Sequence, residues 1–580
     1  MDNKEDDFIG FNENVEENDV INNQNNSSSK KYKIFIVIFI SVLVIAAAIA
    51  LLYFFYFKDK DKDKDKDKDK YNDNEIENEV EDRLLQNYTF KAVYYTESNK
   101  TEVRLCKNPE EILELNIDGI NFYNINSFIF NNSGSHIVYI LLNLEKMDSL
   151  GVVFYANRYL KSVYFAKNLK TSNIKKLNSM FDGCLSLTSI DFSNFNTENV
   201  DDMTKMFNDC KSLTSIDISH FNTKNVLQMD NMFSYSTSLK SIDLSKLDLR
   251  QVVSMYNMFN FCSSLESINL SNLDLAKLEN TMFLLSYNRK LTSVNLKNVK
   301  MPSLLFIDGM FSNCESLKSI DLKSLDTSKI NSFNLLFNEC NSLTSIDLSN
   351  FKADNVYSST YMFNGCHSLT SIDISHFNFS KVVYMDYMFA SCHKLKTVDI
   401  SNIKTDNFVS FWKTFSNCTS LEEIKMPKSA IKVFNVTGLF HNCYKLTSID
   451  LFIFNTEKSQ DFSNMFSNCQ SLKNIDLSNF KTNNLTLMQN MFKGCISLTS
   501  IDLSSFNTSN VTNYNEMFSD CKKLKFIDIS SLRITTNIDS IYFLDLFGNN
   551  ISINGNIKIN KEFYNRIKND SIEKWNISFV

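Results

Sequence analysis

The 26 residues LTSIDLSSFNTSNVTNYNEMFSDCKK, from Leu498 to Lys523, decide the fold. Leu498, Ile501 and Leu503 follow the apolar spacing LxxIxL, and polar residues alternate with them. Alternate side chains of a strand point to opposite faces, so the polar set is expected to face outward. The first third of the stretch therefore predicts a short strand with an apolar inner side.

The rest of the stretch predicts a turn and a segment that packs inward. Asn507–Asn510 can bond nearby backbone groups and so turn the chain without Gly or Pro, of which the whole chain holds only 11 and 3. Between Val511 and Cys521, apolar residues mostly stand three to four positions apart. This spacing favours a short helical or 3-10 segment.

The same pattern occurs fourteen times at a nearly fixed period. The step is 26 residues, except for one of 25 before Leu446. Such a period predicts a repeat solenoid, in which each coil buries its apolar side by stacking on its neighbours. We expect a parallel β-sheet on one face and short helical or 3-10 segments on the other. The leucines that open the LxxI or LxxV motif are Leu187, Leu213, Leu239, Leu265, Leu291, Leu317, Leu343, Leu369, Leu395, Leu421, Leu446, Leu472, Leu498 and Leu524.

Phenylalanine occupies the Phe518 position in thirteen of the fourteen coils. The remaining coil has Leu285 there, with Phe283 two residues away. These rings are expected to form one stacked internal spine rather than a ligand site. The other twelve are Phe181, Phe207, Phe233, Phe259, Phe311, Phe337, Phe363, Phe389, Phe415, Phe440, Phe466 and Phe492.

The repeat resembles that of the BspA-like leucine-rich-repeat surface proteins. The hallmark appears as CKSLTSIDISHFNTKNVLQMDNMF (Cys210–Phe233) and as CISLTSIDLSSFNTSNVTNYNEMF (Cys495–Phe518), with Leu, Ile-Asp, Asn-Thr, Met-Phe and Cys in register. The resemblance covers residues 160–545. It implies a leucine-rich-repeat-like solenoid and a cell-surface protein that contacts host molecules or other cells.

Ile34–Phe57 is an uncharged apolar stretch of 24 residues, longer than the roughly 20 residues that cross a bilayer as a helix. A cleaved signal peptide is the alternative, since Ala46, Ala48 and Ala50 are small, but the apolar run continues for seven residues beyond Ala50. We expect an uncleaved anchor in a single-pass membrane protein, with the C-terminal part at the cell surface. The reverse orientation would place the solenoid in the cytoplasm.

Charge separates the ends of the chain from its repetitive body. Lys58–Lys70 alternates Lys and Asp, and residues 71–83 carry a net charge of −5, so both predict a solvated stalk. Residues 84–580 carry a net charge of only +1, without a basic stripe, which argues against a nucleic-acid partner. The predicted parts are a disordered cytoplasmic tail (1–33), a transmembrane helix (34–57), a charged stalk (58–83), an N-terminal capping region (84–159), a solenoid of about 14 coils (160–545) and a C-terminal cap (546–580).

Twelve of the thirteen cysteines share one repeat position, and Ser236 and Asn288 fill its two other places. Stacked coils would bring them to about 5 Å, but equivalent side chains in a parallel stack point the same way. We expect buried free thiols that act as small apolar residues; disulfides and a metal site are the alternatives. The twelve are Cys184, Cys210, Cys262, Cys314, Cys340, Cys366, Cys392, Cys418, Cys443, Cys469, Cys495 and Cys521.

An Asp follows the strand Ile or Val in eleven coils, while Asn269, Asn295 and Lys425 take its place in the others. A parallel sheet would hold these carboxylates at intervals of about 4.8 Å, where like charges repel. Either Ser hydroxyls and water bond an architectural column, or a Ser-Asp-Ser face captures cations or basic ligand groups. The candidate binding residues are Asp191, Asp217, Asp243, Asp321, Asp347, Asp373, Asp399, Asp450, Asp476, Asp502 and Asp528.

No set of residues in the sequence predicts an enzyme, a cofactor or a metal site. The chain has six His, no nucleophile–base–orienter set at a recurring position and no glycine-rich phosphate loop. Cys366-His367 and Cys392-His393 stand one coil apart, but adjacent residues point to different sides, which argues against zinc. Candidate N-glycosylation sequons include Asn87, Asn269, Asn378, Asn435, Asn484 and Asn510.

The sequence therefore predicts a membrane-anchored cell-surface binding or adhesion protein. Its extended repeat face would contact a protein or glycan on host or neighbouring cells. A structural surface coat or spacer without a specific ligand is the first alternative, because the predicted face is a monotonous run of Ser and Asp. A cytoplasmic scaffold is the second, if the orientation is reversed.

Overall fold

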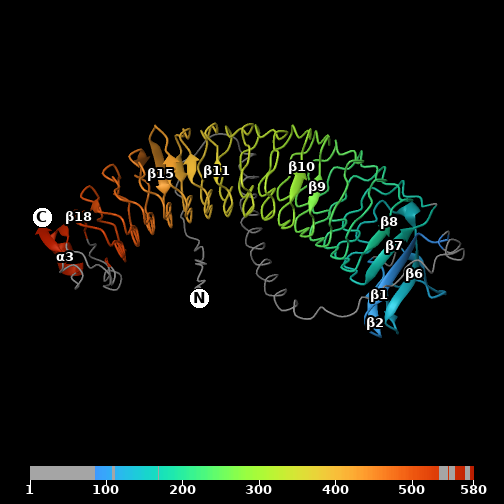
Figure 1. Cartoon of the computed structure of the whole chain (residues 1–580). Coiled ribbons are helices and arrows are strands. Elements are labelled where there is room, and N and C mark those ends of the chain that lie inside the picture. Colours follow the sequence, from blue (N-terminus) through green and yellow to red (C-terminus); the bar gives the residue numbers. More distant parts are fainter. Residues whose placement is uncertain are drawn as a thin grey trace, which may run out of the picture. The chain divides into compact units, whose positions relative to one another are not determined.

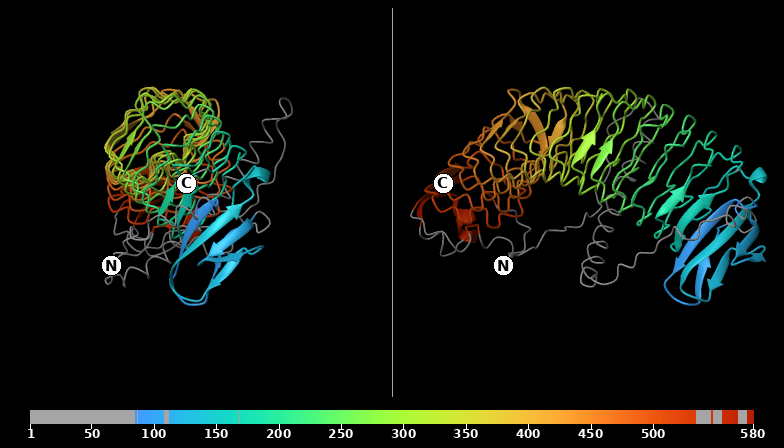
Figure 2. Two further views of the ribbon diagram at one scale, coloured as in Figure 1. Left: turned by 90° about the vertical axis from the view of Figure 1, so that its right-hand side faces the viewer. Right: turned by 45° about the vertical axis from the view of Figure 1, so that its right-hand side comes forward.

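Each repeat closes one coil, and successive coils lie side by side in a row (Figures 1 and 2). The computed structural model describes residues 85, 87–107, 112–167, 169–533, 546–547, 555–567 and 575–580, all within one compact unit, Asn78–Val580. The predicted tail, membrane anchor and stalk lie outside the described residues. Among the described residues, no helix is long and apolar enough to cross a membrane.

The predicted strand lies at the start of the coil and pairs with the same strand one repeat ahead. Ile268 lies opposite Val294 in a parallel pair; both are buried, while their neighbours are exposed, as the alternation of the sequence predicts. The strands of this series are β8 (Ser189–Asp191), β9 (Ser267–Asn269), β10 (Ser293–Asn295), β11 (Ser371–Ile372), β12 (Thr397–Asp399), β14 (Glu423–Lys425), β17 (Ser500–Asp502) and β18 (Phe526–Ile529). A second parallel ladder on another side of the coil contains β13 (Phe408–Ser410), β15 (Ile431–Asn435) and β16 (Phe454–Asn455).

A mostly antiparallel sheet precedes the coils. Its order is β4-β3-β6-β1-β7-β8, and the parallel pairing of β7 with β8 joins it to the first coils. The remaining elements of this region are β1 (Phe90–Thr96), β2 (Thr101–Arg104), β3 (Ile112–Ile117), β4 (Ile120–Phe122), β5 (Ser127–Phe130), β6 (Gly134–Leu142), the 3-10 turn η2 (Leu144–Lys146) and β7 (Leu160–Phe165). At the other end, β19 (Asn556–Ile559) and β20 (Asn576–Phe579) extend the parallel sheet of β17 and β18, and α3 (Lys561–Ile567) lies between them in sequence.

The predicted phenylalanine spine forms the centre of the stack. The rings of Phe181 and Phe207 lie 5.6 Å apart with planes 4° apart, and both are fully buried. The spine continues past the predicted limits of the solenoid, to Phe154 at one end and Phe547 at the other. The offset stacking of neighbouring rings thus joins coils that each hold only one ring at this position.

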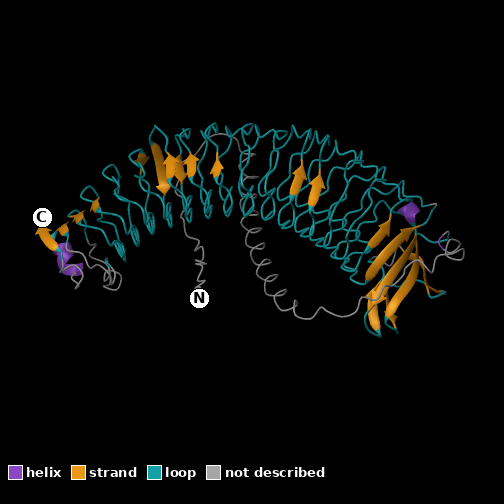
Figure 3. Cartoon of the chain, in the orientation of Figure 1, coloured by secondary structure: helices purple, strands orange, loops and turns teal. Residues whose placement is uncertain are grey.

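The prediction of helical or 3-10 segments on the second side of the coil is wrong. No helix occurs between residues 169 and 533, where loops and turns dominate (Figure 3). The N–H groups of Lys205, Phe207 and Asp209 instead donate to carbonyls of the next coil, at 2.8, 2.8 and 2.7 Å. The N–H groups between them bond three residues back, as at Met206. A helix would keep all of these bonds within one coil.

This alternating turn places two residues of every coil in the left-handed region. Lys205 and Asp209 both have φ of 57°, and the equivalent positions of the other thirteen predicted coils also have positive φ. Glycine occupies only five of these positions: Gly183, Gly309, Gly365, Gly438 and Gly494. A left-handed conformation costs a non-glycine residue roughly 1–2 kcal/mol. Hydrogen bonds to the next coil offset this cost.

All thirteen cysteines are free and buried, as predicted for the twelve in the repeat. Their role is more than apolar packing, because each repeat thiol donates to a spine-position carbonyl of the preceding coil, at 3.0–3.2 Å. Ser236 and Asn288 donate to the equivalent carbonyls, of Phe207 at 2.8 Å and Phe259 at 3.0 Å. Burial raises the pKa of the Cys340 thiol to about 12, which keeps it protonated as a donor.

The Cys340→Ser variant is expected to unfold within about 1 kcal/mol of the wild type, because a hydroxyl replaces the donor as Ser236 already does. Cys340→Ala removes the donor to the Phe311 carbonyl and is expected to lose a further 1–3 kcal/mol, roughly. Urea unfolding under reducing conditions measures both. Equal losses in the two variants would show that the thiol acts through its volume alone.

Candidate functional site

The eleven predicted Asp residues form one column along the stack, because each ends the strand position that opens its coil. We call this column and its flanking serines the Asp face. In every one of them, Oδ1 accepts a hydrogen bond from the backbone N–H two residues ahead, at 2.8–3.1 Å. Asn269 and Asn295 accept the same bond at 3.1 Å. Nine of the Asp residues are exposed, Asp399 is half-buried and Asp528 is buried.

Local hydrogen bonds lower the pKa of several carboxyls of the column, among them Asp347 and Asp373. The backbone N–H of Ser349 lowers the pKa of Asp347, and the Ser375 hydroxyl lowers that of Asp373. Three lysines add ion pairs along the column: Lys323 with Asp347 at 3.8 Å, Lys425 with Asp399 at 3.3 Å and Lys558 with Asp528 at 3.2 Å. Each Asp therefore has a structural role in closing the turn after the strand. Capture of a ligand by the column stays a prediction.

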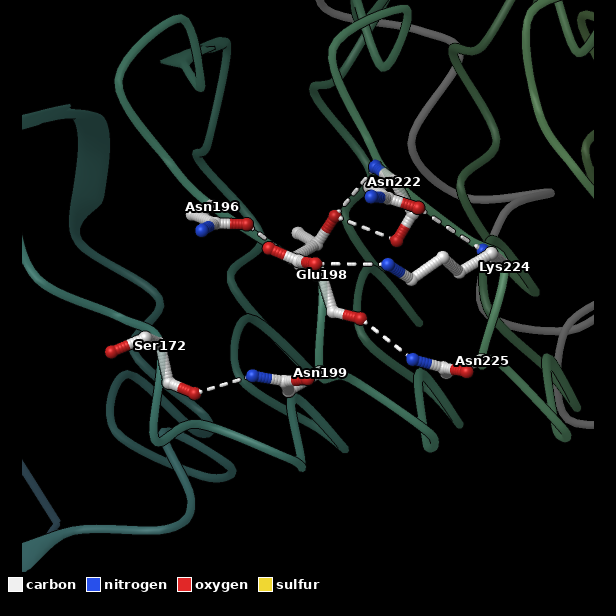
Figure 4. A network of polar contacts seen from close by, with 8 residues as sticks. Ser172, Asn196, Glu198, Asn199, Asn222, Lys224 and Asn225 are labelled. Atoms are coloured by element: carbon white, nitrogen blue, oxygen red, sulfur yellow. Dashed lines mark hydrogen bonds and ion pairs between the residues drawn. The ribbon is translucent and has the colours of Figure 1, made fainter.

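A second column, of asparagines, lies beyond the corner of the coil. The amide of Asn199 donates to the Ser172 carbonyl at 2.7 Å, and that of Asn225 to the Glu198 carbonyl at 2.9 Å (Figure 4). Lys224 bridges to Glu198 in the same network, at 2.9 Å. These side chains replace Gly and Pro as turn formers because they bond the backbone of the preceding coil.

The six candidate sequons differ in whether the amide nitrogen of their Asn is already hydrogen-bonded. Asn484 and Asn510 belong to the asparagine column, and their amides donate to carbonyls of the preceding coil at 2.7 and 2.9 Å. Asn378 donates to Asp354 at 2.7 Å. Asn269 and Asn435 use only the amide oxygen, and Asn87 is exposed. Glycosylation modifies the amide nitrogen, so the structure favours the last three as acceptors.

A third surface carries aromatic side chains where most coils have small polar ones; we call it the aromatic face. It consists of Tyr357, Tyr361, Tyr384, Tyr387, Trp412 and Phe434. Tyr384 is 41% exposed and the other five are half-buried. This surface is not among the features predicted from the sequence. The signal was present, because the residues one repeat before and after Tyr384, with which it forms β-bridges, are Ser358 and Ser410.

Two sets of ring contacts lie within the aromatic face. Tyr361 and Tyr387 stack at 4.6 Å with planes 11° apart, and Trp412 meets Tyr387 edge-on at 5.0 Å. Tyr384 meets Phe434 edge-on at 6.2 Å. The Nζ of Lys413 lies 5.6 Å from the Tyr387 ring centroid. The face thus gathers Tyr and Trp side chains, which are enriched among the residues that dominate the energy of protein interfaces.

Asp386 stands within the aromatic face and belongs to a further polar column. Its Oδ1 accepts from the Ser410 hydroxyl and, at 3.0 Å, from the Trp412 N–H. Asp308 accepts equivalently from Ser332 at 2.7 Å and from the Asn334 N–H at 2.8 Å. Burial raises the pKa of each carboxyl to about 6. Asn334 holds the next place in this column and accepts the same two kinds of bond without a charge.

The predicted surface histidines stack on each other rather than converge with the thiols. The rings of His367 and His393 lie 4.6 Å apart, and each Nδ1 contacts a carbonyl of the next coil, at 2.8 and 3.0 Å. The neighbouring Cys366 and Cys392 are fully buried. Within the described ranges, no group of three or more His, Cys, Asp or Glu side chains is placed to hold a metal ion.

The Asp308→Asn variant is expected to flatten the pH dependence of stability. A raised native pKa means that the native state binds the proton more tightly than the unfolded chain, so this contribution is present below about pH 4 and is lost as pH rises through about 6. At pH 7.5 the variant should gain up to about 3 kcal/mol over the wild type, and at pH 4 little. Urea unfolding at both pH values measures these differences in the free energy of unfolding. The matched variant Asn334→Asp introduces a carboxyl at the next place in the column and should show the opposite pH dependence. Parallel pH profiles for all three proteins would contradict it.

Solved structures similar to this chain include bacterial leucine-rich-repeat proteins. A leucine-rich-repeat protein of Bacteroides ovatus is 17% identical, with a TM-score of 0.42, over 73% of this chain and 94% of its own. A leucine-rich cell surface protein of Faecalibacterium prausnitzii is 16% identical, with a TM-score of 0.29, over 67% and 83%. These likenesses concern the fold only. No curated protein matches the chain significantly.

The repeat and the solenoid confirm the resemblance to the BspA-like leucine-rich-repeat proteins that the sequence predicts. The family model described as "Mycoplasma protein of unknown function, DUF285" matches residues 147–273, 208–308, 305–427 and 434–560. Together these matches cover more than half of the chain, and they extend over the coils described above except for residues 428–433. The chain therefore belongs to the DUF285 family.

Proposed function

We propose that the protein is a membrane-anchored cell-surface binding or adhesion protein, and that the aromatic face is where it contacts a protein ligand on host or neighbouring cells. The observation that carries this proposal is the partial exposure of six aromatic side chains on consecutive coils. The predicted anchor, Ile34–Phe57, and the charged stalk after it would hold the solenoid away from the membrane.

The aromatic side chains are not needed to close their coils. Other coils hold Ser where Tyr384 stands, Thr where Trp412 stands and Asn where Tyr387 stands, and those coils have the same backbone bonds. The inward neighbours Met385 and Phe389 fill the core without them. Tyr and Trp are enriched among residues that dominate binding energy, because they offer large contact area at low entropic cost.

A structural surface coat or spacer is the second candidate function. The uniformity of the Asp face favours it, because eleven coils repeat the same Asp with the same bond to the backbone. A spacer needs length and solubility, and neither requires aromatic side chains at the surface. The two functions therefore differ in what the aromatic face contributes.

The triple variant Tyr384→Ser, Tyr387→Asn, Trp412→Thr is expected to reduce binding of intact, protein-displaying cells to host cells more than about tenfold. Each new residue already occurs at the same repeat position in another coil, so the coils should still close. The matched control is Asp347→Asn with Asp373→Asn, which copies Asn269 and Asn295 of the Asp face and should bind normally. Thermal unfolding of each variant checks the fold.

Three outcomes would count against the proposal. Loss of binding in the control alone would move the site to the Asp face. Unchanged binding in the triple variant, with the wild type adhering, would exclude the aromatic face as the contact. No adhesion by the wild type would favour a spacer, or a solenoid on the cytoplasmic side of the membrane.

A further inference from the structure

We propose that the aromatic face takes an acidic polypeptide segment, with carboxylates against its lysines and apolar side chains against its rings. This inference rests on the proposed function and specifies the chemistry of the partner. It follows from three observations: lysines without ion pairs near the rings in sequence, the hydrogen bonds that already occupy Asp386, and the orientation of the rings themselves.

Three lysines stand close in sequence to residues of the aromatic face: Lys381 precedes Tyr384 by three residues, Lys413 follows Trp412 and Lys432 precedes Phe434 by two. None of them forms an ion pair within the described part of the chain. Lys381 bonds the amide oxygen of Asn355 at 2.7 Å, and Lys432 bonds the Asp406 carbonyl at 3.1 Å. Seven other described lysines do pair with carboxylates: Lys211 with Asp209, Lys224 with Glu198, Lys323 with Asp347, Lys425 with Asp399, Lys481 with Glu457, Lys493 with Glu516 and Lys558 with Asp528. Three cations beside one apolar surface favour an anionic partner.

Strand geometry brings one of these lysines, Lys432, onto the same side of the strand as Phe434. Lys432 and Phe434 alternate along β15 and are both half-buried, whereas Ile431 and Val433 between them are buried. Lys432 also lies opposite Phe408 in the parallel ladder, with its Nζ 5.8 Å from that ring centroid. A segment bound along the coils would thus meet Lys432 and rings together.

The carboxylate closest to the rings in sequence, Asp386, does not neutralise these lysines. Its Oδ1 already accepts from the Ser410 hydroxyl and from the Trp412 N–H. No ion pair joins it to a described lysine. The positive charge of the aromatic face therefore stays available to a partner.

The ring arrangement favours a peptide over a sugar. A sugar ring stacks on an open aromatic face, but Tyr361 and Tyr387 stack on each other, and the edge of Trp412 lies against Tyr387. Rings in a stacked row present their edges outward, and aromatic edges carry partial positive charge. Edges and lysines thus both complement carboxylate oxygens, while the apolar ring area suits aliphatic or aromatic side chains.

The test measures binding of the full-length protein in detergent micelles to a random copolymer of Glu and Tyr. We expect binding that weakens steeply as salt is raised. Lys381→Gln, Lys413→Gln, Lys432→Gln should weaken it about tenfold or more, and the corresponding Lys→Arg triple should bind nearly as the wild type. The matched control, Lys224→Gln, Lys323→Gln, Lys481→Gln, removes three paired lysines and should bind normally.

Two results would overturn the inference while leaving the proposed function standing. In the first, the protein binds heparin but not the Glu–Tyr copolymer, and the Lys→Gln triple weakens heparin binding. This result would assign the face to an anionic glycan. The other is equal binding of a Lys–Tyr copolymer, or no effect of the Lys→Gln triple, in a protein whose cell adhesion still depends on Tyr384 and Trp412. Loss of that dependence would defeat the proposed function itself.

Discussion

The hydrogen bonds from the turn of one coil to the next coil are the constraint on which the rest of the structure depends. At alternate positions, such as Lys205, Phe207 and Asp209, the N–H points along the stack instead of along its own coil. A single coil would leave these donors unsatisfied, which costs roughly 1–3 kcal/mol for each buried group. The coils therefore stabilise one another, and the apolar spine is buried only in their stack.

The same demand explains the polar residues of the interior. Thiols, and the Ser236 and Asn288 side chains that replace two of them, donate to the preceding coil. Thr197 donates to the Asn222 carbonyl and accepts from the Asn222 N–H, at 3.1 and 2.7 Å. Each column thus serves contacts between coils. This dependence between coils also explains why the same residues recur from repeat to repeat, because a substitution in one coil removes a hydrogen-bond partner from the neighbouring coil.

The sequence predicts the features that a single coil determines. The 26-residue period, the inner spine that includes Phe207 and the place of Asp347 after its strand all follow from spacing and alternation. The helical segment does not, because an apolar spacing of three to four residues suits both a helix and alternating turns. What separates the two is the destination of the N–H groups, which is a property of the stack.

The surfaces divide in the same way. The Asp face could be predicted, since one repeat contains it. The aromatic face could be predicted only in part. The departure of Tyr384 from Ser358 and Ser410 is visible in the repeat, but its contact with Phe434, which belongs to another coil, exists only in the stack. The replacement of Cys by Ser236 and Asn288 could have indicated a hydrogen bond at this repeat position, because all three side chains can donate one. Departures from a repeat are thus more informative about contacts and binding than the repeat itself.

Residue-resolved amide hydrogen exchange tests the central claim, that bonds between coils hold the turns, most directly. The account predicts an alternating pattern. The amides of Lys205, Phe207 and Asp209 should exchange only when neighbouring coils separate, and those of Met206 and Asn208, which bond within the turn, should exchange faster. Uniform protection of consecutive amides through this segment, as in a helix, or fast exchange at all five, would contradict it.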